Sequence, residues 1–419
     1  MALSKKPVTG MKDILPREME IRDHVIRIIK DTYKKFGFTG IETPCLENIE
    51  NLTNKQGGEN EKLIFKVMKR GEKLDIHNAE SENDLCDLGL RYDLTVPLVR
   101  FYSNNISTLP SPFKALQIGP SFRAERPQKG RYRQFYQCDI DILGDPSNLA
   151  EIELITATST CLVNLGFKKF EVRINDRRIL RAMASYAGFA KDSFDEVFII
   201  LDKMDKIGLD GVKEELSAHG FASDAINRYT DLFEGLKNNA ADGLRYIAGE
   251  LGDSLDSAIV NWLDEIMSSV NATRTGAFEV VFDPTLVRGM SYYTGTIFEI
   301  AIPEFGGSCG GGGRYDKMVG KFTGQDTPAV GFSIGFERIV MLLLEQDYQI
   351  PNEGRRVAFL VEKNMSADRL SMIMKEAANM RNAGDIVLVS RMNKNKKFQK
   401  EQLEKEGYKE FKEFYVESR

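Results

Sequence analysis

Alternating apolar and polar positions mark the stretch 119–144, and this period of two predicts two β-strands joined by a basic loop. One face of the second strand is apolar and comprises Tyr136, Cys138, Ile140 and Ile142. Its other face comprises Phe135, Gln137, Asp139 and Asp141, and on the first strand it continues with Ser121, Arg123 and Glu125. This polar face suits a ligand that carries both phosphates and a cation. On composition alone, a solvated hairpin explains the pattern equally well.

Helical periods of three to four residues appear on either side of this hairpin. Residues 16–36 predict an amphipathic helix with Gly37 as its C-cap, and a short strand broken at Pro44 follows. Residues 50–89 are polar and rich in glycine and charge, so we expect mobile connections around a strand at 63–68. The patterns further predict a helix at 147–164, a strand at 170–174 and helices from 176 to about 270.

Strand patterns return in the last third of the chain, at 278–283 and 296–302, and an apolar helix follows Gly335. From about residue 355, strands and helices alternate, which predicts a small α/β unit with a largely parallel sheet. The whole pattern predicts an α+β fold. Its expected domains are a core in two parts (1–175 and 271–350), a helical insertion (176–270) and a partial terminal α/β unit (355–419).

Composition excludes several classes of function. The 419 residues are 42% hydrophobic and 28% charged, as in folded proteins with a substantial core. No apolar run is long enough to cross a membrane and the start lacks the apolar core of a signal peptide, which favours the cytoplasm. The 5 cysteines form no CxxC pair, and the 3 histidines lie outside the motifs below. We therefore expect neither a zinc cluster nor a histidine base.

The hairpin sequence FRAERPQKGRYRQFYQCDIDI closely resembles the second signature motif of class II aminoacyl-tRNA synthetases, in the form that histidyl-tRNA synthetases carry. The resemblance implies an antiparallel core sheet flanked by helices. It also implies that Arg123 contacts both histidine and the α-phosphate of ATP, and that Glu125 binds the adenine amino group. Arg131 would lie nearer the γ-phosphate. The resemblance assigns histidine binding to Gln137 and Asp141, with Asp141 reading the imidazole.

The stretch LRYDLTVPLVR, residues 90–100, is similar to a second block of this family. There the acidic residue and the threonine receive the ammonium group of the amino acid, which maps onto Asp93 and Thr95 with Leu94 between them. A cationic amine needs an anion and acceptors at short range, so these residue types fit the role. The alternative is that Asp93 caps a helix that begins at Thr95.

LVRGMSYYTGTIFE, residues 286–299, resembles a signature found in histidyl-tRNA synthetases and not in other class II enzymes. It implies that Arg288 acts on the α-phosphate and that Tyr292 and Tyr293 recognise the imidazole by hydrogen bonds and stacking. Adjacent aromatic residues in a strand are more commonly part of a core. The family usually has Asp where this chain has Ser291, which leaves one supporting hydrogen bond open.

Two further stretches follow this signature. SCGGGG, residues 308–313, permits close backbone approach to a ligand, or is a flexible turn. AVGFSIGFERIV, residues 329–340, resembles the third class II motif, whose arginine stacks on adenine and faces the triphosphate. That arginine is Arg338, and on an otherwise apolar helix it requires a partner or ligand.

The resemblance as a whole implies a histidine–tRNA ligase that uses ATP with Mg2+ and binds tRNA(His). The helix that begins near Pro16, the strand after it and Pro44 resemble the first class II motif, which in the family lies at the dimer interface, so the resemblance also implies a homodimer. No side chain is assigned as a direct metal ligand. The main rival is a catalytically silent relative that regulates ATP phosphoribosyltransferase in histidine biosynthesis. Such relatives tend to lose the arginine and the paired tyrosines. A third alternative, an RNA-binding module without catalysis, fits poorly with a net charge of -5.

The terminal unit resembles the anticodon-binding domain of the family but stops some strands early at Arg419. Its basic stretch comprises Arg391, Lys394, Lys396, Lys397 and Lys400. These cations suit RNA phosphates, and a merely solvated lysine run is the equally weighted alternative.

Overall fold

The computed structural model describes residues 3–53, 61–239, 242–289, 292–351 and 353–416. The chain divides into two compact units. Unit 1 comprises Met1–Asp13 and Val25–Leu342, and unit 2 comprises Ile14–His24 and Leu343–Arg419. In the part of the chain that is described, no helix combines the length and the apolar character that a membrane crossing requires.

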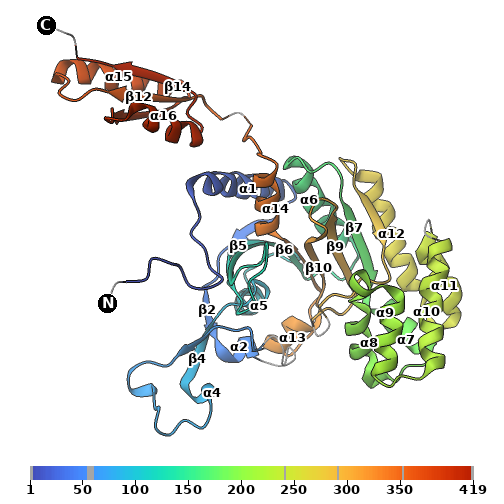
Figure 1. The fold of residues 1–419 in the computed structure, drawn as a ribbon. Coiled ribbons are helices and arrows are strands. Elements are labelled where there is room, and N and C mark those ends of the chain that lie inside the picture. Colours follow the sequence, from blue (N-terminus) through green and yellow to red (C-terminus); the bar gives the residue numbers. More distant parts are fainter. Residues whose placement is uncertain (1–2, 54–60, 240–241, 290–291, 352, 417–419) are drawn as a thin grey trace. The chain divides into compact units, whose positions relative to one another are not determined.

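An eight-stranded sheet forms the centre of unit 1 (Figure 1). In spatial order its strands are β1 Thr39–Ile41, β5 Phe113–Phe122, β6 Gln134–Leu143, β11 Ala329–Ile334, β10 Gly307–Arg314, β9 Thr296–Ile302, β7 Glu171–Asp176 and β8 Glu279–Phe282. From β5 to β7 all neighbours are antiparallel, whereas the edge strands β1 and β8 run parallel to β5 and β7. The predicted antiparallel core is confirmed, with a parallel strand at each edge.

The predicted hairpin is the β5–β6 pair, which runs from Phe113 opposite Leu143 to Phe122 opposite Gln134. Because side chains alternate along β6, its apolar set points into the core on one side of the sheet. Cys138, Ile140 and Ile142 are all buried there. The opposite face of β6 carries Gln137, Asp139 and Asp141, as the sequence predicts.

The glycine run is strand β10 and not a flexible turn. A Cβ atom on Gly312 would lie 1.9 Å from the carbonyl oxygen of Gly331, and one on Gly310 would lie 2.9 Å from that of Ser333. Only glycine therefore lets β10 pass so close to β11. At the end of β10, Arg314 forms a buried ion pair with Glu151 at 2.6 Å, which fastens the sheet to helix α6, Leu149–Asn164.

Residues 50–89 hold more regular structure than predicted. Strands β2 Leu46–Asn48, β4 Cys86–Leu90 and β3 Lys66–Met68 form a three-stranded antiparallel sheet, flanked by the short helices α2 Ile49–Thr53 and α4 Glu82–Leu85. The strand expected at 63–68 is reduced to β3, and β4 is absent from the prediction. The apolar residues of β4 do alternate, at Cys86, Leu88 and Leu90, but this run is short, directly follows a polar and charged stretch, and contains Gly89, which weakens a strand signal. Residues 54–60 lie outside the described part of this stretch.

Two helices, α1 Pro16–Lys35 and α14 Phe336–Glu345, have residues in both units. In unit 1, α5 Thr95–Asn105 follows β4, and α13 Lys317–Thr323 follows β10. The helices predicted between 176 and 270 are α7 Arg177–Ala187, α8 Phe194–Leu201, α9 Met204–Ala218, α10 Ser223–Asn238, α11 Gly243–Leu251 and α12 Ser257–Thr273. α10 packs against α7, α9 and α11, while α12 packs against α6, β7 and β8, so the group adjoins one edge of the sheet (Figure 1).

The terminal part of unit 2 is the predicted α/β unit. Its elements are β12 Arg356–Val361, α15 Ala367–Asn382, β13 Ile386–Arg391, α16 Lys396–Lys405 and β14 Glu410–Phe414. The three strands are parallel in the order β13-β12-β14. Alternate residues of β12 bury on opposite sides, with Val357, Phe359 and Val361 in one cluster and Ala358 and Leu360 in the other. Hydrophobic burial on both faces of the sheet explains why β12 reads as a continuous apolar run.

Candidate active site

Unit 1 contains a cavity of about 890 Å³ whose walls include residues of β6, β9, β10 and β11. The structure places all but one of the predicted site residues in the wall of this cavity. They are Asp93, Thr95, Arg123, Glu125, Arg131, Gln137, Asp141, Arg288, Tyr292, Tyr293 and Arg338. The exception is Leu94, which is only 1% exposed and points into the core. The chain turns into α5 at this residue, so its two neighbours face the cavity while Leu94 does not. Ser291 lies outside the described residues.

The floor of the cavity is formed by the polar face of β6. Asp139 is 4% exposed and Asp141 is 3% exposed, and burial raises the pKa of both carboxyl groups, that of Asp139 to about 7. The hydroxyl of Tyr315 donates a hydrogen bond of 2.6 Å to Asp141 Oδ1. Gly331 lies directly opposite Asp141 on β11, and a Cβ atom there would be 2.0 Å from the same oxygen. The Asp141 carboxylate therefore occupies the space that a side chain at position 331 would need.

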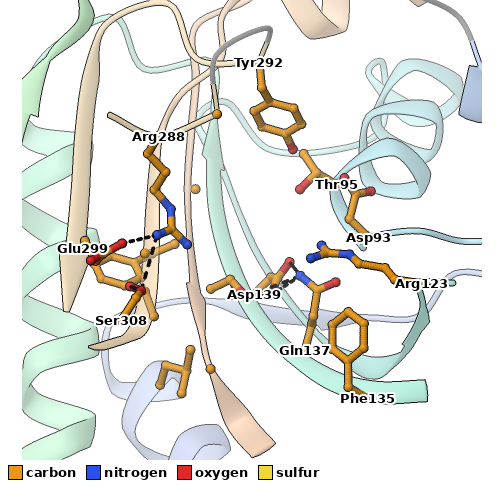
Figure 2. Close-up of a pocket in the computed structure, with 18 of the residues that line it drawn as sticks. Asp93, Thr95, Arg123, Phe135, Gln137, Asp139, Arg288, Tyr292, Glu299 and Ser308 are labelled. Atoms are coloured by element: carbon orange, nitrogen blue, oxygen red, sulfur yellow. Dashed lines mark hydrogen bonds and ion pairs between the residues drawn. The ribbon is translucent and has the colours of Figure 1, made fainter. Parts of the chain in front are cut away.

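The start of α5 forms a second wall. Asp93 Oδ1 accepts a hydrogen bond of 3.0 Å from the backbone N–H of Val96, so Asp93 does cap the helix, as one of the two interpretations predicts. The same carboxyl group lines the cavity, so capping and ligand binding are compatible at this residue. Burial raises its pKa. Figure 2 shows Thr95 beside Asp93, with the hydroxyl of Tyr292 pointing toward Thr95.

Arg123 follows β5 and is held by backbone and aromatic contacts. Its Nε donates to the carbonyl oxygen of Tyr92 at 3.1 Å, and its guanidinium lies 4.2 Å from the Tyr92 ring centroid and 5.0 Å from that of Phe135. Glu125 stands 4.0 Å from Arg123 and 3.8 Å from Arg131, measured between the nearest nitrogen and oxygen atoms. These longer contacts leave both guanidinium groups able to take an anionic ligand.

Arg288 reaches into the cavity from the opposite side (Figure 2). Its Nη1 donates to Glu299 Oε2 at 2.5 Å and to Ser308 Oγ at 3.4 Å. A Cβ atom on Gly311 of β10 would lie 2.6 Å from its Cζ, so the glycine strand gives this side chain its room. Tyr292 and Tyr293 meet edge to face, with ring centroids 4.9 Å apart, in the loop before β9 and not in a strand. They are half-buried in the cavity wall, which distinguishes them from ordinary core aromatics.

Arg338 satisfies its charge partly through contacts to the β9–β10 turn. Its Nη1 donates to the carbonyl oxygen of Ser308, and its guanidinium lies 5.2 Å from the ring centroid of Phe305. Burial, and then the charge of Arg131, lower its pKa. A Cβ atom on Gly130, at the tip of the basic loop, would be 3.4 Å from Arg338 Cγ. The loop and α14 thus meet at this end of the cavity.

Several cavity residues are absent from the sequence prediction. Asp139 lies on the predicted polar face without an assigned role, although its position between Gln137 and Asp141 is a sufficient signal. Glu299 lies within the signature stretch, where alternation along β9 puts it on the same side as the cavity. Tyr315 and Ser333 gave no signal, because their importance comes from hydrogen bonds to residues far away in sequence.

The cavity combines cationic groups with hydrogen-bond acceptors. Arginines occupy two sides and can stabilise negative charge, while carboxyl and phenol groups between them can accept hydrogen bonds from a cation and a heterocycle. No histidine lies in its described wall, so the arrangement favours charge stabilisation and alignment over proton transfer by imidazole. Such a site suits the joining of two anionic groups beside a bound cation.

Comparison with known proteins agrees with this geometry. The profile of the family described as histidyl-tRNA synthetase matches residues 10–339. A histidine–tRNA ligase of Leifsonia xyli is 44% identical over 420 residues, covering 98% of this chain and 95% of that protein. The structure of histidyl-tRNA synthetase from Nostoc sp. PCC 7120 has a TM-score of 0.77 at 26% identity and covers 97% of this chain and 90% of that chain.

A second solved structure bears on the fold alone. An ATP phosphoribosyltransferase regulatory subunit/histidyl-tRNA synthetase from Bacillus halodurans C has a TM-score of 0.78 at 20% identity, and covers 100% of both chains. The profile match and the 44% identical relative carry the assignment instead, since each spans most of the chain. The α+β fold, the signature stretches and these similarities agree: the chain belongs to the histidyl-tRNA synthetase family.

Proposed function

We propose that this chain is a histidine–tRNA ligase, which activates L-histidine with ATP to histidyl-adenylate and pyrophosphate. It then transfers histidine from the adenylate to the 3′ end of its tRNA, with AMP as the leaving group. The observation that carries the proposal is the shared cavity of Arg123, Asp141, Arg288 and Tyr292. These residues come from two separate stretches of sequence, the hairpin and the stretch 286–299. A cavity that gathers them supplies both the cations for a phosphate and the acceptors for a histidine.

In the first step the histidine carboxylate attacks the α-phosphorus of ATP. Two anions approach each other, and no proton has to move, so the chain must supply positive charge and alignment. Arg123 and Arg288 approach from opposite sides of the cavity and are the catalytic residues we assign (Figure 2). The ion pair of Arg288 with Glu299 at 2.5 Å fixes the guanidinium before the substrates arrive.

Histidine recognition uses the groups between the two arginines. Asp93 and Thr95 accept hydrogen bonds from the ammonium group, together with the amide oxygen of Gln137. Asp141, oriented by the hydroxyl of Tyr315, accepts from an imidazole N–H. Tyr292 and Tyr293 close the pocket over the ring, with a flat face and hydroxyl groups that suit a polar heterocycle.

ATP binding uses the residues near the basic loop. Glu125 binds the adenine amino group, Arg338 stacks on adenine, and Arg131 lies toward the γ-phosphate. No three His, Cys, Asp or Glu side chains gather as a metal site among the described residues. Mg2+ prefers phosphate oxygens and water over an all-protein cage, so it would come to the site on ATP and offset phosphate charge. The residues above bind and orient ATP with or without a preformed metal site.

Further parts of the proposal concern partners and organisation. The chain acts in the cytoplasm as a homodimer and binds tRNA(His) in the transfer step. Its domains are the two-part core (1–175 and 271–350), the helical insertion (176–270) and the terminal unit (355–419). The insertion would hold the acceptor end of the tRNA, and the terminal unit would contact the anticodon region.

The rival function is that of a regulatory subunit of ATP phosphoribosyltransferase. The fold does not distinguish the ligase from the regulatory subunit, since the Bacillus halodurans structure is described as a regulatory subunit/histidyl-tRNA synthetase. Two observations favour the ligase: the arginine and both tyrosines line the cavity, and the relative at 44% identity is a histidine–tRNA ligase. A silent subunit has no need for this set.

The test is exchange of labelled pyrophosphate into ATP by the purified full chain, with histidine compared against other amino acids, followed by charging of tRNA(His). We expect exchange with histidine alone among the standard amino acids. No exchange at any histidine concentration, together with binding to ATP phosphoribosyltransferase, would establish the rival instead.

A further inference from the structure

The amide of Gln137 is held from one side only. Its Nε2 donates to Asp139 Oδ2 at 3.2 Å and contacts Ser333 Oγ at 3.4 Å. Its Oε1 is buried and accepts no hydrogen bond from the described residues. Figure 2 shows the nitrogen turned toward Asp139 and the oxygen turned toward Arg123 at the cavity wall. A buried acceptor without a donor is unfavourable, so this oxygen is ready for an N–H group from a ligand.

The direction of the amide follows from Asp139. Ser333 Oγ donates to Asp139 Oδ1 at 2.5 Å, and these two residues face each other directly across β6 and β11. An ionised carboxylate only accepts hydrogen bonds, so Asp139 requires the NH2 group of Gln137 and not its oxygen. Asp139 and Ser333 therefore determine which end of the amide faces the ligand. Asp139 is 4% exposed and is fixed in place by these bonds.

We propose that Asp139 is a positioning residue: it orients the Gln137 amide so that Oε1 accepts a hydrogen bond from the ammonium group of bound histidine. The inference rests on the proposed function, because it takes histidine as the ligand. Asp139 itself does not touch the substrate in this role. It acts on affinity for the ammonium group, whereas the contact to the imidazole is made by Asp141.

The proposal predicts a pH dependence. Burial raises the pKa of Asp139 to about 7, and the charged groups that act on it are Asp93, Asp141 and Arg123, with the phenols of Tyr33 and Tyr293 also nearby. Below this pH the protonated Asp139 can donate to Gln137 Oε1, and the amide then turns its NH2 group toward the ligand. The NH2 group repels an ammonium ion. Affinity for the ammonium group should therefore rise as the pH rises through about 7.

Two histidine analogues separate this effect from titration of the imidazole. Histidinol keeps the ammonium group but lacks the carboxylate, whereas imidazole-propionate lacks the ammonium group. Both carry the same imidazole. The two imidazoles titrate at different pH, because the ammonium group of histidinol disfavours imidazole protonation and the carboxylate of imidazole-propionate favours it. Each inhibition constant for pyrophosphate exchange, measured from pH 5.5 to 8, is therefore expressed for the neutral-imidazole form from the inhibitor's own titration, and the ratio of these corrected constants reports the ammonium contact. We expect the inhibition constant of histidinol to fall relative to that of imidazole-propionate as the pH rises. A pH-independent ratio in an active wild-type chain overturns the proposal.

Asp139→Asn mimics the protonated state at every pH. The new amide keeps an oxygen for Ser333 but presents its NH2 group to Gln137, which reverses the Gln137 amide. We expect KM for histidine to rise at least about tenfold and histidinol to weaken by a similar factor, the size of one hydrogen bond to a charged group. Imidazole-propionate should be unaffected, and the pH dependence of the ratio should vanish. Equal weakening of both analogues, or an unchanged KM, contradicts the proposal.

A second substitution supplies the rescue. Gln137→Glu combined with Asp139→Asn offers a carboxylate that accepts from the new amide and still presents an oxygen to the ligand. Histidinol binding should recover, which a merely structural loss would not do. Asp145→Asn, outside the cavity just after β6, is the matched control and should leave both inhibition constants unchanged. If Asp139→Asn does not fold, the wild-type pH profile alone decides. A wild-type chain without any exchange would instead refute the proposed function.

Discussion

The cavity of unit 1 and the basic stretch of unit 2 are both rich in charge, but the contacts that hold their cationic side chains differ. In the cavity, Arg123 and Arg288 are held by contacts that leave their guanidinium groups facing the void. In the basic stretch, Lys396 and Lys400 both place Nζ 2.5 Å from the carboxylate of Glu413. Hydrogen bonds from this pair lower the pKa of Glu413 to about 2. Arg288 is ion-paired as well, with Glu299 at 2.5 Å, but its planar guanidinium has further N–H groups that can face the cavity, whereas each lysine has a single ammonium group held at Glu413.

The difference lies in what fixes the side chains. Sheet alternation, close glycine strands and buried hydrogen bonds set the cavity groups, so each has few alternative positions. The lysines lie on an exposed helix and can exchange a protein carboxylate for water or phosphate at low energy. We expect substitutions in the cavity to change the chemistry greatly, and those in the basic stretch to change it little.

The largest effect should come from Arg288→Ala. It removes a preorganised cation from the side of the α-phosphate, and kcat for histidine-dependent pyrophosphate exchange should fall at least about a hundredfold. Arg288→Lys should restore only part of the rate, because an ammonium group lacks the planar fork. Arg245→Ala, on an exposed side chain of α11, is the control and should have no effect. A loss below about threefold would remove Arg288 from the mechanism.

Gly331→Ala tests the histidine side of the cavity. The new methyl group would lie 2.0 Å from Asp141 Oδ1 and 3.2 Å from Tyr315 Cε1, so the carboxylate must leave its hydrogen bond to Tyr315. KM for histidine should rise about tenfold or more, in line with loss of a hydrogen bond to a charged group, while KM for ATP changes little. Gly249→Ala is the control, since nothing lies within 4 Å of its Cβ position. An unchanged histidine KM would show that Asp141 does not read the imidazole.

Glu299→Gln should have a smaller effect on rate. The substitution keeps the shape of the side chain but replaces the ion pair to Arg288 by a neutral hydrogen bond, so the guanidinium is less firmly oriented. We expect kcat to fall about tenfold, with both KM values nearly unchanged, because Glu299 supports Arg288 and contacts no substrate. Glu299→Asp, which is too short to reach, should match it. A loss equal to that of Arg288→Ala would instead place Glu299 in direct contact with ATP.

The sequence predicts the elements whose patterns are local. The β5–β6 hairpin follows from the alternation of side chains, and the parallel terminal unit follows from the alternation of strands and helices. The stretch from 176 to 270 is helical, as its periodicity predicts. The prediction misses strand β4 because its alternating run is short and follows a polar stretch, while its partners β2 and β3 lie far away in sequence. The sequence also does not show that the glycine run is strand β10. The run needs glycine because β10 passes close to β11, and this approach is a tertiary property that no local pattern reports.

The same limit applies to the site. Alternation brings Gln137, Asp139 and Asp141 to one face, but their hydrogen bonds to Ser333 and Tyr315 come from β11 and the end of β10. No local pattern reports such partners. Leu94 is the opposite case, a residue predicted for the site that does not line it. The motif Asp93–Thr95 is continuous in sequence, and sequence alone does not say which of its three residues face the ligand. The basic stretch could be located in the sequence, whereas its neutralisation by Glu413 could not.

The smallest effect should come from the lysines, and the chain offers a matched pair of variants. Lys394→Ala with Lys397→Ala removes two charges that form no ion pair in the described structure, whereas Lys396→Ala with Lys400→Ala removes the two held by Glu413. Both should leave histidine-dependent exchange, which needs no tRNA, within about twofold of wild type.

In tRNA charging, the first pair should raise KM for tRNA about threefold and reduce its salt dependence, because lost phosphate contacts release fewer counterions. The substitution of Lys396 and Lys400 should have less effect on KM for tRNA, because Glu413 already offsets the charge of these two lysines in the wild-type chain. In the variant Glu413 loses both partners, but it lies on a solvated surface. Equal weakening by both pairs would mean that tRNA displaces Glu413 from Lys396 and Lys400. The basic stretch would then resemble the cavity, with its cations poised for phosphate despite the ion pairs of the free protein.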